Sequence, residues 1–181
     1  MRVTKTKLSG VLLIEPDVFS DQRGYFMESY NSMKYANLGI DYSFIQDNHS
    51  FSQETGVIRG LHYQLNPMAQ TKLIRVIAGA IYDVVVDVRS GSPTCGQWEA
   101  FILSEDNKMQ LLVPKGFAHG FCTLVTSTQV EYKVDQYFSI QHDKGIRWDD
   151  PVLRIPWPTS NPILSDKDKR HPFLKEAELN F

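Results

Sequence analysis

The stretch GVIRGLHYQLNPMAQTKLIRVIAGAIYDVVVDVR, residues 56–89, consists of three apolar runs separated by Asn, Pro and Gly. Short runs rich in Val, Ile, Leu and Tyr and bounded by turn residues are typical of β-strands. Seven more runs of this kind lie at residues 10–16, 43–50, 98–104, 108–114, 118–125, 128–138 and 145–148. This density of short strands predicts an all-β sandwich or barrel.

Few segments favour a helix. Asn31 and Ser32 can cap a short helix over residues 33–38, and Ser165 can cap another near the C-terminus. The segment from Asp150 onward contains five prolines, so we expect it to be a tail that wraps the barrel rather than a second domain. The sequence therefore predicts a single domain over residues 1–181, with short helices and a C-terminal tail from about residue 150 to 181.

The composition limits the classes of function. The 181 residues are 42% hydrophobic and 22% charged, with a formal net charge of −2, which fits a globular protein without the basic surface that duplex nucleic acid requires. No apolar run approaches the roughly 18 residues of a membrane span, and the apolar stretch near the N-terminus is too short for a signal peptide. Cys95 and Cys122 lie far apart in the sequence, which favours free thiols in a reducing compartment. We therefore expect a cytoplasmic protein that binds neither membranes nor nucleic acid.

The strand pattern over residues 128–138 predicts which side chains face inward. Tyr132 shares its parity with Val130 and Val134, whereas charged residues occupy the alternate positions, and alternate residues of a strand face opposite sides. The Tyr132 hydroxyl should therefore point into the barrel. Residues 80–89 do not separate as cleanly, because an apolar face lies opposite a face that carries two aspartates. The pattern alone does not say which of these two faces is inside.

A second informative stretch is VPKGFAHGF, residues 113–121, in which a Pro-x-Gly turn is followed by His119 near the start of a strand. This PxGxxH pattern resembles the second conserved motif of the cupin barrels. The HxH pair of the first cupin motif is replaced here by His62 followed by Tyr and Gln, and Lys72 stands downstream in place of a carboxylate. An ammonium repels a divalent cation, so we expect no metal site. Without the motif, His119 would be interpreted as a loop histidine hydrogen-bonded to the backbone.

His62 lies in a strand that is otherwise ordinary, where it can serve as a core residue, a metal ligand or a base. With a metal disfavoured, its combination with Lys72 and Tyr132 suggests proton transfer. An imidazole near its ordinary pKa removes protons at neutral pH, an ammonium stabilises the enolate that forms, and a phenol on the opposite face returns a proton. Such chemistry inverts a carbon next to a ketone and needs no metal or nucleotide cofactor.

A catalytic imidazole also needs a partner that fixes its tautomer. The stretch LSDKDK, residues 164–169, offers Asp166 and Asp168, and Asp83 is a third candidate. Ser165 and Asp168 also have the spacing of a helix capping box. The sequence therefore leaves Asp168 open between a helix cap and a catalytic partner.

The stretches FSDQRGYFMESY, FIQDNHS, RGLHYQ, QTKLIRV, IYDVVVDVR, SPTCGQW, LLVPKGFAHGF, EYKVDQYFS, IRWDDP and LSDKD lie between about Gly10 and Pro172. Through them the chain resembles the dTDP-4-dehydrorhamnose 3,5-epimerases, and RGLHYQ combined with PKGFAHGF is the most specific match. The resemblance implies a cupin-type jelly-roll homodimer, with an N-terminal arm over about residues 1–30 that reaches the neighbouring site. It also implies inversion of C3 and C5 of dTDP-4-dehydro-6-deoxy-D-glucose, without a cofactor, on the route to L-rhamnose.

The resemblance assigns roles to single residues. His62 corresponds to the proton acceptor, Asp168 to its dyad partner and Tyr132 to the proton donor. Lys72 corresponds to the lysine near the sugar ketone and the developing enolate. The positions that correspond to substrate-binding residues are Arg23, Glu28, Gln46, Asp47, Asn48, Arg59, His119, Asp143 and Lys167. At residue 143 many members of the family carry a glutamate instead.

Arg23 and Arg59 suit a diphosphate, because a guanidinium donates in a fork that fits phosphate oxygens. Arg59 and His62 have opposite parity, so a regular strand cannot point both into one pocket. Either Gly60 marks a bulge that re-aims one of them, or Arg59 points outward toward a partner subunit. Without the resemblance, Arg23 and Glu28 would be interpreted as a solvated surface pair.

Two other functions remain open on the sequence alone. A single inversion at C3 or C5, on another deoxysugar pathway, would use the same residues. A catalytically inactive barrel that binds a nucleotide sugar would be expected to lack the acid or the base, and both are present. The sequence does not determine which aromatic residue stacks on thymine, the candidates being Phe19, Phe26, Tyr137 and Phe138.

Overall fold

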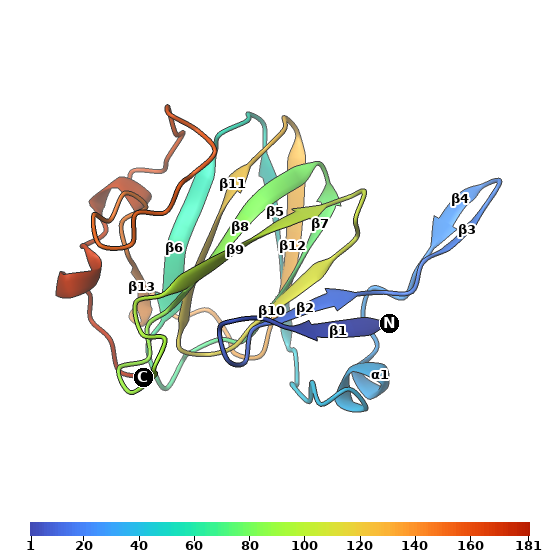
Figure 1. Cartoon of the computed structure of the whole chain (residues 1–181), viewed down its shortest axis with the longest axis horizontal. Helices are drawn as coiled ribbons and strands as arrows, with labels where there is room; N and C mark the ends of the chain where they lie inside the picture. Colours follow the sequence, from blue (N-terminus) through green and yellow to red (C-terminus); the bar gives the residue numbers. More distant parts are fainter.

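The computed structural model describes all 181 residues, and its two antiparallel β-sheets face one another as a flattened barrel (Figure 1). The six-stranded sheet has the order β1 (Arg2–Lys5), β2 (Leu12–Glu15), β10 (Gln110–Val113), β7 (Lys72–Ala78), β12 (Thr128–Val134) and β5 (Gln46–Ser52). The five-stranded sheet has the order β13 (Asp143–Gly145), β6 (Ile58–Gln64), β11 (Phe117–Thr123), β8 (Ala80–Asp87) and β9 (Trp98–Ser104). The predicted all-β jelly-roll barrel is confirmed.

The remaining elements are short. A hairpin of β3 (Phe19–Asp21) and β4 (Gly24–Phe26) projects from the barrel at the right of Figure 1. The helices are α1 (Ser32–Ala36) and the 3₁₀ turns η1 (Asp168–Arg170) and η2 (Leu174–Glu176). No helix has the length and apolar character that crossing a membrane would take. The prediction of few and short helices is confirmed.

Apolar side chains form three layers of core. One cluster, including Ile74, Val85 and Phe121, fills the space between the two sheets. A second covers the outer face of the five-stranded sheet and includes Trp157 of the C-terminal segment. A third lies outside the six-stranded sheet, where Tyr35 of α1 packs. Each sheet is therefore covered on both faces, and its central strands are apolar on both sides.

This double coverage explains why residues 80–89 do not alternate cleanly. Val84 and Val86 lie in the outer cluster under the C-terminal segment, whereas Ile81 and Val85 lie in the cluster between the sheets. Asp83 shares the parity of Ile81 and Val85 and is fully buried. The aspartate-bearing face is therefore the inner one, which the sequence pattern left undecided.

Backbone hydrogen bonds attach the C-terminal segment to the five-stranded sheet. Ile163 forms an isolated parallel bridge with Val57 next to β6, and the Arg147 N–H donates to the carbonyl of Pro172 at 2.9 Å. The Asp150 carboxylate accepts the backbone N–H of Leu174 at 2.7 Å. Because residues 163 and 172 are both attached, the η1 turn between them lies against β6.

A β-bulge in β6 decides which side chains enter the barrel. His119 of β11 lies opposite His62, but Phe121, two residues later, lies opposite Arg59, three residues earlier. One extra residue is therefore inserted into β6, which brings Arg59 and His62 onto the same face despite their opposite parity. The first of the two explanations offered by the sequence, a bulge at Gly60, is the one observed.

Several short strands were not predicted. No apolar run in the sequence predicts a strand at β1, β3 or β4, and of the strand expected over residues 145–148 only Gly145 belongs to one. β1 is largely polar and exposed along most of its length, and every residue of β3 and β4 is exposed. Strands without a buried face have no periodic apolar signal, so pattern reasoning misses them.

Replacing Gly60 by Ala should lower the free energy of unfolding by about 3 kcal/mol, as expected for an added side chain at a positive φ in a packed position. Gly60 has φ +130°, and a Cβ there would lie 2.5 Å from Gly120 Cα. Gly39→Ala is the matched control, because Gly39 has φ +80° with open space around it, and should cost only about 1 kcal/mol. Urea unfolding of both variants measures the difference. Equal losses of unfolding free energy in the two variants would mean that the close approach of β6 and β11 adds nothing to the cost of a side chain at residue 60.

Candidate active site

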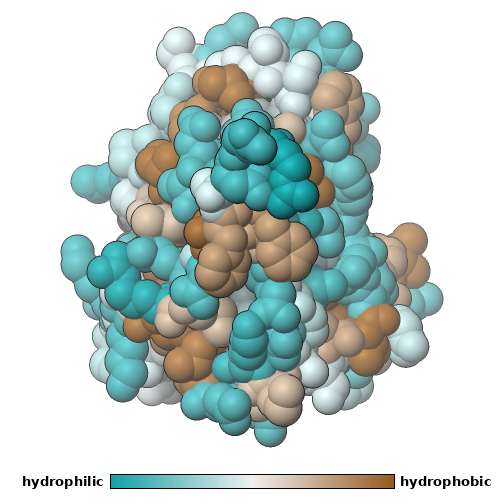
Figure 2. All heavy atoms as spheres, turned by 90° about the vertical axis from the view of Figure 1, so that its right-hand side faces the viewer, coloured by the Kyte–Doolittle hydropathy of each residue, from teal (hydrophilic) through white to brown (hydrophobic).

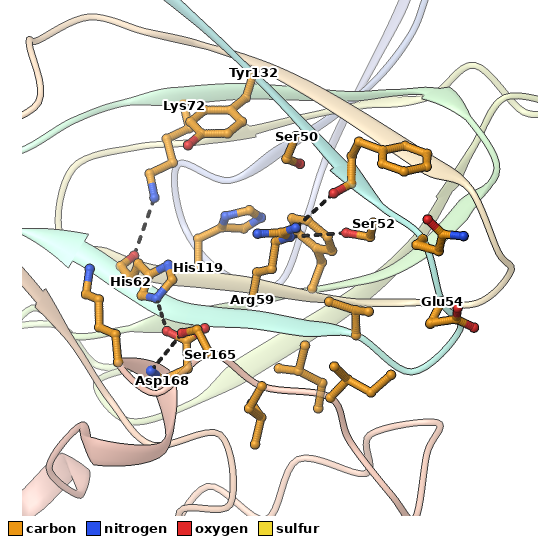
Figure 3. A pocket seen from close by; sticks show the side chains of 18 residues that line it. Ser50, Ser52, Glu54, Arg59, His62, Lys72, His119, Tyr132, Ser165 and Asp168 are labelled. Carbon is orange, nitrogen blue, oxygen red and sulfur yellow. Dashed lines mark hydrogen bonds and ion pairs between the residues drawn. The ribbon is translucent and has the colours of Figure 1, made fainter.

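A cavity of about 570 Å³ opens between the two sheets next to the C-terminal segment (Figure 3). The four residues predicted to be catalytic line it, together with three of the predicted substrate-binding residues. The lining side chains that carry polar groups include His62, Lys72, Tyr132, Asp168, Arg59, His119, Lys167, Ser50, Ser52, Glu54 and Ser165. The cavity therefore brings several titratable groups together next to the apolar cluster that fills the rest of the space between the sheets.

The two sheets supply the two sides of the cavity. His62 comes from β6 of the five-stranded sheet, whereas Tyr132 and Lys72 come from β12 and β7 of the six-stranded sheet. Tyr132 lies opposite Ile74 in the β12–β7 register, and Lys72 is two residues from Ile74, so both side chains point to the same face. Figure 3 shows the phenol and the ammonium on one side of the cavity and the imidazole on the other. The predicted inward orientation of Tyr132 agrees with this placement.

A hydrogen bond connects His62 to the C-terminal segment. His62 Nε2 lies 2.5 Å from Asp168 Oδ1, and Asp168 is only 3% exposed. The backbone N–H of Asp168 donates to Ser165 Oγ at 3.1 Å. The Ser165 hydroxyl therefore binds the backbone of Asp168, although the N-cap position of η1 is Lys167, and the Asp168 carboxylate is directed to His62. Of the other candidates for this partner, Asp166 pairs with Lys169 on the surface.

The His62 ring is oriented and kept neutral by its surroundings. Since an ionised carboxylate only accepts hydrogen bonds, Nε2 carries the proton and Nδ1 is left as an acceptor. Burial lowers the pKa of His62 below its ordinary value of 6.5, although the hydrogen bond to Asp168 and its charge oppose the shift. Burial acts to raise the pKa of Asp168, but the neighbouring rings of His171 and His62 outweigh it and hold that pKa far below its usual range. The pair at neutral pH is therefore a neutral imidazole beside a carboxylate.

The opposite side of the cavity has the complementary properties. Burial lowers the pKa of the Lys72 ammonium to about 8, and its Nζ donates to the carbonyl of His62 at 3.4 Å. Burial raises the pKa of the Tyr132 phenol above 10, although Arg59 opposes the shift. At neutral pH the cavity thus holds a base on one side and, on the other, a protonated phenol and an ammonium.

A second histidine–carboxylate pair lies deeper in the barrel. His119 Nε2 lies 2.9 Å from Asp83 Oδ2 and 3.0 Å from Oδ1, and the two residues belong to the adjacent strands β11 and β8. Asp83 is therefore the partner of His119 and not of His62. The simpler interpretation of His119, as a loop histidine bonded to backbone, is wrong, since the residue is buried in a strand with a carboxylate as its partner.

Arg59 enters the cavity because of the bulge at Gly60. Its Nε donates to Ser52 Oγ at 3.1 Å and its Nη2 to the carbonyl of Phe51 at 2.9 Å. These contacts with β5 hold the guanidinium in place, and its remaining N–H groups stay available for a ligand. Arg59 therefore lies in the cavity of its own protomer rather than pointing outward.

The remaining predicted substrate-binding residues lie at different distances from the cavity. Gln46 and Asn48 share the inner parity of β5 with Ser50 and Ser52, and a hydrogen bond of 2.9 Å joins their side chains. Asp47 has the opposite parity, is exposed and pairs with Lys133. The structure therefore directs two of the three residues toward the cavity face and the third away from it.

At the cavity mouth, Lys167 forms an ion pair with Asp143. Arg23 and Glu28 do not line the cavity of this protomer. Arg23 pairs with Asp21 at the tip of the hairpin, and Glu28 pairs with Lys34. The interpretation of Arg23 and Glu28 as a pair with each other is therefore wrong.

His171 is a residue of this region that the sequence analysis missed. It follows Asp168 by three residues, a spacing that indicates proximity in a helical turn. His62, Asp168 and His171 place ligand atoms within 4.8 Å of one another, as a metal site would require. Two atoms bound to one zinc ion lie about 3.3 Å apart in tetrahedral geometry, whereas His62 and Asp168 lie 2.5 Å apart. That distance indicates a direct hydrogen bond, and the absence of a metal remains a prediction.

Comparisons with known proteins extend over nearly the whole chain. A family model described as dTDP-4-dehydrorhamnose 3,5-epimerase matches residues 5–176. The protein of that name from Shigella flexneri is 50% identical over 169 residues, which make up 93% of each chain.

Solved structures agree with this result. The crystal structure of dTDP-4-dehydrorhamnose 3,5-epimerase from Bacillus anthracis, with TDP and PPi bound, has 59% identity and a TM-score of 0.94, covering 95% of this chain and 98% of that one. The dTDP-6-deoxy-D-glucose-3,5-epimerase of Legionella pneumophila, in complex with dTDP-4-keto-L-rhamnose, has 43% identity and a TM-score of 0.92, covering 97% and 93%.

Asp168→Asn should lower the pKa of His62 further. The charge of Asp168 and its hydrogen bond are the influences that raise this pKa, and the substitution removes the charge. An NMR titration of the His62 ring protons measures the change. Asp166→Asn is the matched control, because Asp166 is exposed and forms an ion pair with Lys169 on the surface. An unchanged His62 titration in Asp168→Asn would show that the dyad has no electrostatic effect.

Proposed function

The chain belongs to the dTDP-4-dehydrorhamnose 3,5-epimerase family, and we propose that it inverts C3 and C5 of dTDP-4-dehydro-6-deoxy-D-glucose with the residues of the cavity described above. The product is dTDP-4-dehydro-L-rhamnose, an intermediate of dTDP-L-rhamnose biosynthesis. The observation that carries the proposal is the placement of His62 and Tyr132 on opposite sheets across one cavity, with Lys72 beside the phenol.

Each inversion begins with proton removal. The C4 ketone acidifies the neighbouring C3–H and C5–H bonds, and His62 Nδ1 accepts the proton because Nε2 is occupied by Asp168. The electron pair of the broken C–H bond forms a carbon–carbon double bond, and the ketone oxygen becomes an enolate. The Lys72 ammonium lies on the side of the cavity where it can stabilise this negative charge.

The inversion ends with protonation from the other face. Tyr132 donates its hydroxyl proton to the carbon while the enolate returns to the ketone. The His62 imidazolium then releases its proton to solvent and the Tyr132 phenolate regains one, so that the enzyme returns to its starting state. No electrons are gained or lost overall, and the ketone of the substrate makes a separate cofactor unnecessary.

The same cavity contains groups suited to the rest of the substrate. Arg59, His119 and Lys167 line it, and a guanidinium and an ammonium are the groups that commonly bind phosphate oxygens. The Bacillus anthracis relative was crystallised with TDP and PPi, which supports a nucleoside diphosphate as part of the ligand. We assign Arg59 to the diphosphate. We propose that Gln46, Asn48 and Asp143 contact the sugar or the nucleoside.

The projecting hairpin supports a homodimer. Phe19 is 65% exposed and Phe26 is 68% exposed, and the Arg23 side chain is 85% exposed. Figure 2, which faces this side of the molecule, shows apolar side chains at the surface among hydrophilic ones. Aromatic side chains left this exposed on a single protomer suggest a surface that a second copy covers. In such a dimer Arg23 would enter the cavity of the partner subunit, where it could bind the diphosphate together with Arg59.

His62→Asn should abolish exchange of the substrate C3 and C5 hydrogens with solvent deuterium, with a loss of about 10³-fold, since general base catalysis is typically worth 10²–10⁴-fold. Binding of dTDP should persist, because His62 contributes no charge to the diphosphate site. Proton NMR in deuterated buffer with EDTA present measures the exchange at each carbon. Undiminished exchange would remove His62 from the mechanism, and exchange at one carbon in the unmodified enzyme would indicate a single inversion.

The pH dependence of kcat/KM should be bell-shaped. His62 must be neutral, and because its pKa lies below 6.5 the rate should fall only when the pH is lowered below that value. Lys72 must be protonated, and its pKa of about 8 places the alkaline fall there. In Lys72→Arg the guanidinium stays charged over this range, so the alkaline fall should disappear even though the rate is lower. Retention of the fall near pH 8 would assign it to another group.

Mixing two inactive variants tests whether the arm acts on the neighbouring subunit. If Arg23 acts in the partner's site, a dimer of His62→Asn with Arg23→Ala contains one intact site, formed by the Arg23 of one chain and the His62 of the other. After random subunit exchange about a quarter of the sites should be intact. No recovery of activity, with dimer formation verified by sedimentation, would place Arg23 in its own protomer or outside the site.

A further inference from the structure

His171 combines three features that together call for an explanation. Its side chain is 10% exposed, its Nε2 is buried without a hydrogen-bond partner, and this nitrogen lies 3.5 Å from Asp168 Oδ1. Buried polar groups are almost always hydrogen-bonded, and one without a partner costs about 1–3 kcal/mol. The atom at which His171 points is the same carboxylate oxygen that accepts from His62.

The surroundings hold the ring in this position. The backbone of Gly145 leaves the space that the ring occupies, since a Cβ at Gly145 would lie 2.5 Å from His171 Nε2. Gly145 is also the register partner of His62 across β13 and β6. On the other side, the carbonyl of Pro172 accepts the N–H of Arg147 at 2.9 Å, which attaches the chain next to His171. The rings of His171 and His62 meet edge to face, with centroids 5.5 Å apart.

We propose that His171 is a positioning residue of the epimerase: its Nε2–H shares the Asp168 carboxylate with His62 and holds that carboxylate in the orientation that presents His62 Nδ1 to the substrate. His171 is not among the residues that line the cavity, so it acts through Asp168 and not on the substrate. In the proposed arrangement the ring rotates slightly from this position, which shortens the 3.5 Å separation to a hydrogen bond. This inference rests on the proposed role of His62 as the base.

The electrostatic consequence has a definite sign. A donor on Asp168 disperses the negative charge that favours the His62 imidazolium, so its removal should raise the pKa of His62. The other charged groups that act on His62 are Lys72 of β7 and Lys167 beside η1, and Lys167 is paired with Asp143 of β13. On β11, His119 is the register partner of His62 and is itself paired with Asp83 of β8. The substitution of His171 leaves all of these groups in place. The shift is therefore opposite in direction to the one expected for Asp168→Asn.

The main test compares His171→Phe with His171→Gln. Phe keeps an aromatic ring of similar size without the donor, whereas the Gln Nε2 amide can still donate to Asp168. His171→Phe should lower kcat about tenfold, in the range typical of residues that hydrogen-bond a functional side chain without touching the substrate. The decrease of kcat at acidic pH should move to higher pH, and KM should stay nearly unchanged. His171→Gln should recover most of both effects.

The control for a general histidine-to-phenylalanine effect is His49→Phe. His49 is exposed on β5 and bonds Gln129, so the acid fall should keep its position. Equal impairment of the Phe and Gln variants of His171, or a loss of kcat without a shift of the acid fall, would reduce His171 to a packing residue and overturn the proposal.

A measurement on the unmodified protein covers the case in which the variants do not fold. Long-range ¹⁵N–¹H correlation spectra distinguish a His171 ring protonated at Nε2 from one protonated at Nδ1. The proposal requires the proton on Nε2, and a ring protonated only at Nδ1 would overturn it while leaving the proposed epimerase function intact. Retained exchange in His62→Asn would instead remove His62 as the base, the role on which this inference rests, so the two failures are distinguishable.

Discussion

The hydrogen bond between His62 Nε2 and Asp168 Oδ1 is the interaction on which the site depends. It joins the barrel to a C-terminal segment more than one hundred residues away in the sequence. By occupying one ring nitrogen, it leaves the other to face the cavity as an acceptor. Without the attachment of residues 163 and 172 to the sheet, the carboxylate would not lie beside the imidazole.

Charged side chains inside a barrel lose their hydration, and burial therefore disfavours their ionised forms. In this protein some of the buried charged groups have a hydrogen-bonding partner that offsets this cost, and one does not. Asp83 is paired with His119 and Asp168 with His62, whereas Lys72 is left without a carboxylate partner and its pKa falls to about 8 by burial. The ammonium is therefore less stabilised before the reaction than it is beside an enolate, which is the condition for stabilising a transition state more than the ground state.

Two facing sheets suit a reaction in which a proton leaves one face of a sugar ring and another arrives at the opposite face. In the proposed mechanism, a sugar ring between the sheets would meet an imidazole from β6 on one side and a phenol from β12 on the other. Because the sheets are held apart by the apolar cluster that Ile74, Val85 and Phe121 represent, the distance between base and acid is a property of the fold. Apolar clusters also cover the outer face of each sheet.

Much of this could be inferred before any coordinates. The all-β class follows from the short apolar runs, and the inward orientation of Tyr132 follows from the parity of its strand, because both signals are local. His62 and Lys72 were identifiable by their departure from a metal-binding pattern, which is also a property of neighbouring residues.

Other features were decided only by the tertiary structure. Pairing of Asp168 with His62 and of Asp83 with His119 depends on which strands and segments meet, and a helix cap at Ser165 was an equally good interpretation of the same residues. The bulge at Gly60 places Arg59 in the cavity. The spacing of three residues between Asp168 and His171 indicates that they are close only if a helical turn forms there, and it does not indicate a role for His171. Local sequence determines the conformation and the inner face of a strand, whereas the partner of a buried charge is selected by contacts between distant segments, and no period in the sequence records those contacts.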